Sequence, residues 1–198
     1  MKETGIYGGS FNPIHKGHVQ LAETICQEGW VDEVWFLVSP QNPFKQDATD
    51  LMDEQVRLSL AQIAVRNHPR LKACDFEFSL PRPSYTAHTL AALRKAYPGR
   101  RFTLIIGADN WQTFPLWKSP EEILLHHRIL IYPRSGYPID EADLPAGVDL
   151  VDMPLLDISS TALRHCIAQG GDASYGLDAA VWEEIRKKGY YQEGKKQA

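Results

Sequence analysis

The sequence predicts an α/β fold built on a mostly parallel, doubly wound sheet with helices on both faces. Short runs of β-branched and aliphatic residues alternate along the chain with longer segments of helical periodicity. Such alternation is typical of parallel strands joined by right-handed helical crossovers. The chain has 198 residues, of which 43% are hydrophobic, and this suits one well-buried core. We therefore expect a single Rossmann-like domain over residues 1–198.

Six short apolar runs are the expected strands, because most are flanked by Gly, Pro or Asp. They are Gly5–Tyr7, Glu33–Val38, Leu71–Phe78, Phe102–Ile106, Arg128–Tyr132 and Val148–Val151. Open parallel sheets bind ligands beyond the carboxyl ends of their strands, near the switch in strand order. The stretches expected to hold a ligand are therefore Gly8–His18, Ser39–Lys45, Gly107–Trp117 and Pro133–Tyr137.

The segments between the strands have helical patterns. Val56, Leu60 and Ile63, for example, lie on one helical stripe. The expected helices are Lys16–Glu28, Leu51–Asn67, Thr86–Tyr97 and Glu121–His126, followed by Ser159–Gln169 and Leu177–Gly189. The last two form a helical C-terminal part over about residues 157–190. Ser159 or Ser160 is the expected N-cap of the first of them.

Charge and cysteine content exclude several classes of protein. Lys and Arg number 21 against 25 Asp and Glu, so the chain lacks the basic excess of a nucleic-acid-binding protein. Its three cysteines have no metal-binding spacing, and no apolar run approaches the roughly 20 residues that span a bilayer. The N-terminus lacks the features of a signal peptide. We expect a cytoplasmic protein without nucleic-acid or membrane partners; a homo-oligomer is left open.

The stretch GGSFNPIHKGH, residues 8–18, is the first candidate for chemistry. Gly8 and Gly9 at the end of a strand allow a tight turn and close approach of a ligand, and the following helix start offers N–H groups to an anion. His15 and His18 are three residues apart and fall on one face, with Gly17 leaving room between them. The pattern predicts a phosphate-facing loop. An ordinary loop with surface histidines stays open, as does a metal pair, although two histidines lack the remaining ligands of zinc.

The stretch ISSTALR, residues 158–164, is the second candidate. Its three hydroxyl residues stand at a helix N-terminus, and Arg164 follows one turn later. Together they offer backbone donors, hydroxyl donors and a planar cation, which suit a polyphosphate. The alternative is an ordinary capping stretch with a solvent-facing arginine.

Taken together, the two motifs resemble the HxGH and ISSTxxR-like elements of the nucleotidylyltransferase superfamily. The stretches SYT (84–86), GADN (107–110), FPLW (114–117) and RSGY (134–137) resemble the bacterial nicotinate mononucleotide adenylyltransferases more closely. The resemblance runs from the first strand to the last helix. It implies transfer of AMP from ATP to nicotinate mononucleotide, which yields deamido-NAD and pyrophosphate without a covalent enzyme intermediate. Mg²⁺ would accompany the triphosphate, with no metal site in the protein itself.

The resemblance also implies roles for particular residues. His15, His18 and Arg164 would be catalytic, as donors to the phosphates. The residues implied for ATP are Gly8, Gly9, Ser10, Phe11, His18, Gly107, Asp109, Ser159, Ser160 and Arg164. Those implied for the mononucleotide are Ser10, Lys45, Thr86, Trp117, Lys118 and Arg134.

Several of these residues have plainer interpretations from the pattern alone. Trp117 suits core packing, Lys45 a solvated loop, and Asp109 and Thr86 helix caps. The sequence also departs from the family pattern: Ser10 stands where threonine is common, His88 where an acidic residue is frequent, and Ser135 in place of a proline. These departures leave the phosphate motifs intact and concern local loop detail.

Other functions remain open at this stage. The acceptor could be nicotinamide mononucleotide, or the chain could be a phosphopantetheine adenylyltransferase or a cytidylyltransferase, since the phosphate motifs are shared across the superfamily. A non-catalytic nucleotide-binding module is a rival of a different class. The intact histidines and Arg164 argue against it.

Overall fold

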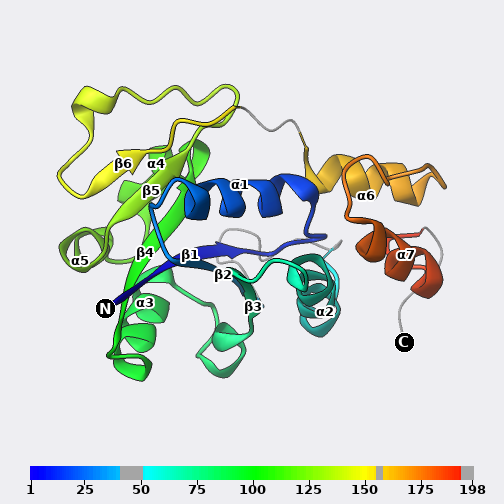
Figure 1. Ribbon diagram of the computed structural model, residues 1–198, viewed down its shortest axis with the longest axis horizontal. Coiled ribbons are helices and arrows are strands. Elements are labelled where there is room, and N and C mark those ends of the chain that lie inside the picture. Colours follow the sequence, from blue (N-terminus) through cyan, green and yellow to red (C-terminus); the bar gives the residue numbers. More distant parts are fainter. Residues whose placement is uncertain (41–50, 155–157, 193–198) are drawn as a thin grey trace.

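A computed structural model describes residues 1–40, 51–154 and 158–192, and its centre is a parallel sheet (Figure 1). Within these residues the sheet has six strands in the order β3-β2-β1-β4-β5-β6. The strands are β1 Lys2–Gly9, β2 Glu33–Val38, β3 Leu71–Cys74, β4 Arg100–Gly107, β5 Ile129–Tyr132 and β6 Val148–Leu150. All five neighbouring pairs are parallel. The chain winds outward from β1 to β3 and then returns to the other side of β1, so the predicted doubly wound sheet is confirmed.

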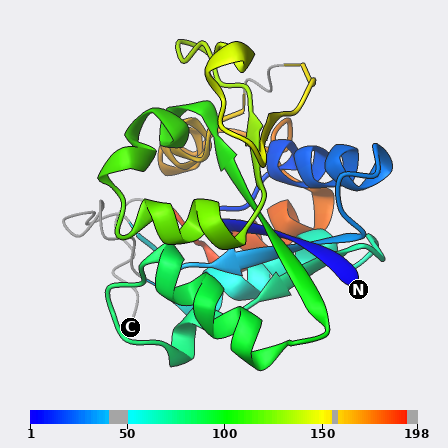
Figure 2. The same ribbon diagram turned by 90° about the vertical axis from the view of Figure 1, so that its left-hand side faces the viewer.

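Helices cover both faces of this sheet (Figures 1 and 2). They are α1 Lys16–Gln27, α2 Glu54–Val65, α3 Thr86–Ala96, α4 Ala108–Thr113, α5 Pro120–His126, α6 Ser160–Ala168 and α7 Ala179–Lys188. Apolar side chains of α1, α2, α6 and α7 share one core cluster, and those of α3 and α5 share the other. Successive strand residues alternate between the two clusters, as Tyr7 and Ile6 do, because side chains in a strand point to opposite faces.

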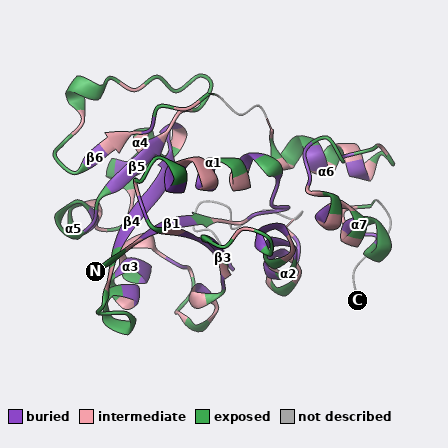
Figure 3. Cartoon of the chain, viewed as in Figure 1, coloured by how far each residue is buried: buried purple, intermediate pink, exposed green. Residues whose placement is uncertain are grey.

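Burial follows the same layers. Figure 3 shows the central strands largely buried and the outer faces of the helices exposed. Ile6, Phe36, Ile105 and Leu130 are each at most 1% exposed. Strands covered on both faces consist of nearly continuous apolar residues, and this is why they could be predicted from the sequence. Within the described residues, no helix is long and apolar enough to cross a membrane.

The structure corrects one predicted strand and adds one helix. Leu71–Phe78 was expected to be a single strand, but β3 ends at Cys74 and a 3-10 helix follows at Phe76–Ser79. β3 is an edge strand paired to β2 only over Leu71–Cys74, so the next residues close a turn in which Phe78 N donates to Asp75 O at 2.8 Å. The stretch Gly107–Trp117 was expected only as a connection. It contains α4, which is too short to show helical periodicity.

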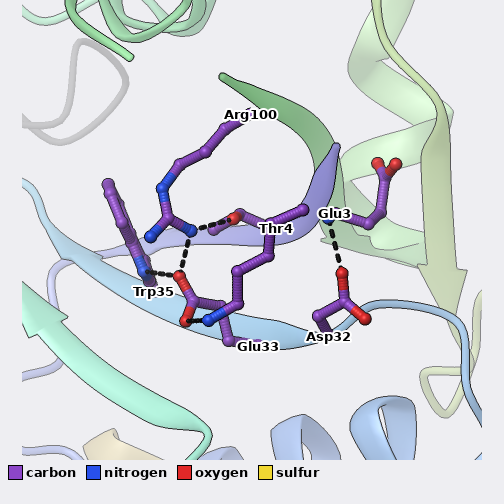
Figure 4. A network of polar contacts seen from close by, with 7 residues as sticks. Glu3, Thr4, Asp32, Glu33, Trp35 and Arg100 are labelled. Atoms are coloured by element: carbon purple, nitrogen blue, oxygen red, sulfur yellow. Dashed lines mark hydrogen bonds and ion pairs between the residues drawn. The ribbon is translucent and has the colours of Figure 1, made fainter. Parts of the chain in front are cut away.

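Ion pairs close the amino-terminal end of the sheet, which is opposite to the stretches expected to bind a ligand (Figure 4). Glu33 pairs with both Lys2 and Arg100. Arg100 also donates to Thr4 Oγ1 at 2.8 Å, and Trp35 Nε1 donates to Glu33 Oε1 at 2.8 Å. These contacts join β1, β2 and β4 at their starting ends.

Candidate active site

A large pocket lies beyond the carboxyl ends of β1 and β4, where the strand order reverses. Its volume is about 790 Å³, which is ample for a nucleotide. Every predicted site residue lines it except Lys45, which lies outside the described residues. The lining residues predicted from the sequence are Gly8, Gly9, Ser10, Phe11, His15, His18, Thr86, Gly107, Asp109, Trp117, Lys118, Arg134, Ser159, Ser160 and Arg164. The structure therefore brings together residues from both ends of the chain.

The two histidines stack on one another at the start of α1. His15 is the N-cap of this helix, and its ring centroid lies 3.5 Å from that of His18, with 21° between the ring planes. His15 N donates to His18 Nδ1 at 3.2 Å, so a neutral His18 carries its ring proton on Nε2. A Cβ on Gly17 would lie 3.1 Å from His15 Nδ1. The room that Gly17 leaves is thus filled by the ring of His15 itself.

Both imidazoles are neutral in the free protein at neutral pH. Burial lowers the pKa of His15 to about 4, and the neighbouring Arg134 charge adds to this effect. Burial also lowers the pKa of His18 well below its usual value, with further contributions from His15 and Arg134. Each ring therefore offers one N–H donor and carries no charge until an anion binds nearby.

The second motif is hydrogen-bonded to the first. Ser160 Oγ donates to Pro13 O at 2.9 Å, and Arg164 Nη1 donates to Asn12 O at 2.8 Å. Ser159 caps α6, because its Oγ accepts from Ala162 N at 3.1 Å, as the sequence predicted. The N-terminus of α6 therefore faces the same pocket as the loop after β1.

A third group of residues follows β4 and β5. Asp109 Oδ1 lies 3.5 Å from Arg134 Nε, and the Arg134 guanidinium lies 5.5 Å from the centroid of the Tyr132 ring. A Cβ on Gly107 would come within 2.3 Å of Asp109 Oδ1, so a side chain there would displace the carboxylate. Asp109 stands in the first turn of α4, whose N-cap is Gly107, so the helix-cap interpretation of Asp109 is wrong.

A fourth group lies on the α3 side of the pocket. Thr86 is the first residue of α3 and its N-cap is Tyr85, so the capping interpretation of Thr86 is wrong as well. The ring of Trp117 packs on Phe114 with centroids 5.4 Å apart. Trp117 Nε1 is buried without a hydrogen-bond partner among the described residues. A buried N–H normally finds a partner, so this one is available to a ligand or to water.

Sequence reasoning missed a buried acidic residue, Glu77, that lines the same pocket. Glu77 is 6% exposed and accepts a hydrogen bond from Thr89 Oγ1 at 2.8 Å. Burial raises the pKa of its carboxyl group. Ser39 and Ser84, from the predicted stretches Ser39–Lys45 and SYT, also line the pocket. Glu77 was missed because it was assigned to the predicted strand Leu71–Phe78, whereas it lies in the 3-10 helix that follows β3. Only its nearness in sequence to the SYT stretch could have indicated a place at the site.

Comparisons with known proteins agree with this geometry. A family model described as cytidylyltransferase-like matches residues 6–166. A relative from Bacteroides fragilis, named "Probable nicotinate-nucleotide adenylyltransferase", is 50% identical over 183 residues, covering 92% of this chain and 90% of the relative. One of the same name from Bacteroides thetaiotaomicron is 50% identical over 185 residues, covering 93% of this chain and 91% of the relative.

The fold has a solved counterpart. The structure titled "Plasmodium falciparum nicotinic acid mononucleotide adenylyltransferase complexed with NaAD" superposes with a TM-score of 0.82 at 23% identity, covering 96% of this chain and 98% of that chain. At this identity the likeness supports the fold alone.

Sheet order, pocket and motifs define a nucleotidylyltransferase, and the chain belongs to the cytidylyltransferase-like family. Within that class it groups with the nicotinate-nucleotide adenylyltransferases. The resemblance inferred from the motifs is thereby confirmed.

The neutral histidines make the free protein sensitive to acid. Between about pH 4 and 6.5 the unfolded chain binds a proton at His15 that the folded chain does not, so stability rises with pH across this window. We expect this residue to remove up to roughly 3 kcal/mol of stability as the pH falls through it. Urea unfolding of the wild type and of His15→Asn, from pH 4.5 to 7.5, should give a flatter pH dependence for the variant. Equal slopes for the two proteins would contradict the assignment.

Proposed function

We propose that this chain transfers the AMP group of ATP to nicotinate mononucleotide, giving deamido-NAD and pyrophosphate in NAD biosynthesis. One observation carries the proposal. The two phosphate motifs are hydrogen-bonded to each other inside one pocket, through Ser160 to Pro13 and Arg164 to Asn12. An aromatic and hydroxyl-bearing wall beside them, with Trp117 and Thr86, suits a pyridine ring. The names of the close relatives support the same substrates.

The histidines would act at the phosphorus under attack. An oxygen of the mononucleotide phosphate attacks the α-phosphorus of ATP in line, the bond from this phosphorus to the bridging oxygen breaks, and pyrophosphate leaves. Such a transfer depends on positioning and on donors aimed at the charge that gathers on the phosphoryl oxygens. His18 is suited to this task because its Nδ1 is occupied by His15 N, which leaves Nε2–H to donate. The charge of a bound triphosphate would raise the pKa of both rings and strengthen them as donors.

The start of α6 would hold the outgoing pyrophosphate. The helix N-terminus, the hydroxyls of Ser159 and Ser160 and the Arg164 guanidinium provide donors toward the β- and γ-phosphates. Gly8, Gly9, Ser10 and Phe11 would surround the α-phosphate from the other side. Asp109, with Gly107, would accept hydrogen bonds from the ribose of the adenosine.

Mg²⁺ would enter the site with the triphosphate as part of the substrate. Across the described residues, no cluster of three or more His, Cys, Asp or Glu side chains is arranged to hold a metal ion. In sites that bind nucleotides, Mg²⁺ usually takes its ligands from substrate phosphates and water. The ion would neutralise part of the triphosphate charge while the protein residues orient it.

The acceptor would occupy the wall formed by α3 and the 3-10 helix Phe114–Leu116. Trp117 would stack on the pyridine ring, and Thr86 with Lys118 would meet the pyridine carboxylate. Lys45 and Arg134 would contact the mononucleotide, with Lys45 at its phosphate. We also propose a cytoplasmic location, which the free thiols of Cys26, Cys74 and Cys166 support.

Pyrophosphate release tests the proposed reaction directly. We expect release from MgATP with nicotinate mononucleotide, and a lower kcat/KM with nicotinamide mononucleotide and with phosphopantetheine as parallel acceptors. The carboxylate would be favoured because Lys118 and helix α3 present positive charge and N–H groups to it. Absence of release with nicotinate mononucleotide, or faster release with phosphopantetheine, would overturn the proposal.

Replacing His18 tests its role in the chemical step. His18→Ala should lower kcat by about 10²- to 10³-fold, because one donor to the transition state is lost. The KM for ATP should change much less, since the other phosphate donors remain. His126→Ala, at a half-exposed position on α5, is the matched control and should keep wild-type turnover. Undiminished kcat in the His18 variant would refute the catalytic assignment.

A further inference from the structure

A buried arginine outside the two motifs supports the loop that faces the phosphates. Arg57 lies on α2 and is only 1% exposed. Its guanidinium donates to Met52 O at 2.8 Å, Ser10 O at 2.6 Å, Ser39 O at 2.7 Å and Pro40 O at 3.3 Å. Within the described part of the chain it makes no ion pair with a carboxylate, and these four hydrogen bonds all go to backbone carbonyls. Asp53 and Glu54 act on its charge from a greater distance.

These hydrogen bonds converge on the carboxyl ends of β1 and β2. Ser10 follows β1 and Ser39 follows β2, and both residues line the pocket. Ser39 N also donates to Gly9 O at 2.9 Å, which ties the two strand ends together. The guanidinium of Arg57 therefore fixes the loop after β1 and the loop after β2 relative to each other.

The Ser10 carbonyl belongs to the peptide unit that joins Ser10 to Phe11, and Phe11 has an unusual backbone conformation. Phe11 has φ of +44°, which is in the left-handed region that residues with a Cβ rarely adopt. Its ring is held by packing, with centroid distances of 5.1 Å to His18, 5.6 Å to Tyr7 and 5.4 Å to Phe36. The backbone here is thus fixed from two sides, by Arg57 on the Ser10 carbonyl and by the buried Phe11 ring.

The direction of this peptide follows from its planarity. The Ser10 carbonyl and the Phe11 N–H belong to one trans peptide unit and point in opposite directions. Because the carbonyl points at the buried guanidinium, the N–H points to the side of the loop opposite Arg57, and Phe11 itself lines the pocket. An acceptor bonded to a cation also polarises its peptide, so the N–H becomes a stronger donor.

We propose that Arg57 is a positioning residue that aims the Phe11 N–H at the phosphoryl group being transferred. This rests on the proposed function above. Lysine could not replace it, because an ammonium group lacks the planar fork that reaches several carbonyls at fixed angles. The charge of Arg57 also contributes positive potential beneath a site for a polyanion.

A spectroscopic measurement on the wild-type protein tests the contact itself. The amide proton of Phe11 should move downfield in NMR spectra when MgATP or a non-hydrolysable analogue is added, because it gains a charged acceptor. The amide proton of Gly99, which precedes β4 at the other end of the sheet, is the internal control and should not move. An unchanged Phe11 resonance at saturating nucleotide would overturn the proposal, whether or not the protein has the proposed activity.

Steady-state kinetics then test the role of Arg57. Arg57→Lys should lose about 10²-fold in kcat, as expected for a misplaced donor, with smaller changes in both KM values. Arg100→Lys is the matched control, since Arg100 donates to Thr4 and Glu33 at the far end of the sheet, and its kcat should stay within threefold of wild type. Guanidinium at millimolar concentration should restore turnover to Arg57→Ala at least tenfold more than methylammonium does.

A purely structural role predicts a different result. In that case activity would fall only in proportion to the unfolded fraction measured by urea titration, kcat per folded molecule would stay within threefold, and guanidinium would not rescue it. Any of these results would overturn the proposal. If the wild type shows no turnover with any acceptor, the proposed function fails, and the Phe11 resonance alone decides the contact.

Discussion

The candidate active site depends on two hydrogen bonds that join distant parts of the chain. Ser160 Oγ reaches Pro13 O and Arg164 Nη1 reaches Asn12 O, across 147 and 152 residues of sequence. Lys16 adds to this junction, because its backbone N donates to Gly176 O at 2.8 Å and its Nζ donates to Ser174 O at 2.9 Å. The C-terminal helices are thereby placed beside the loop that leaves the central strand. Without the junction, neither motif would have the opposite wall that a triphosphate needs.

Two arginines around the site are held by backbone carbonyls. Arg57 and Arg164 both donate to backbone carbonyls of the loops around the pocket, and the stacked histidines are neutral. Carboxylates pair with cations mainly elsewhere, as Glu33 does with Arg100 at the opposite end of the sheet. A protein with formal net charge −4 can in this way present a local positive potential to a polyanion. Asp109, beside Arg134, is the exception within the pocket, and it stands where a ribose rather than a phosphate is proposed.

Most of the fold could be predicted from the sequence, because strands buried on both faces are continuous apolar runs separated by helical patterns. The predicted strand over Leu71–Phe78 was wrong at its end, since pairing at a sheet edge depends on the length of the neighbouring strand and not on local propensity. The helix α4 was missed because six residues are too few to show a periodicity.

The predicted site residues within the described part of the chain all line one pocket. The sequence singled them out because the motifs contain glycines, histidines and hydroxyls that a plain loop does not require. Arg57 and Glu77 were not found, and the reason is physical. A charged residue within a helix or strand pattern is normally solvent-exposed, and only the tertiary structure reveals that these two are buried. Glu77 lines the pocket, and Arg57 donates to Ser10 and Ser39, which line it. The prediction for Gly17 also needed the tertiary structure. Its place between two histidines indicated open space for a ligand, whereas the ring of His15 occupies that space.

A crystal structure with Mg²⁺ and a non-hydrolysable ATP analogue tests the central claim most directly. The claim is that the loop after β1 and the start of α6 form one triphosphate site. It predicts the α-phosphate within hydrogen-bond distance of His18 Nε2, and the β- and γ-phosphates at Ser159, Ser160 and Arg164. A triphosphate bound along α3, or one that contacts only one of the two motifs, would contradict the account.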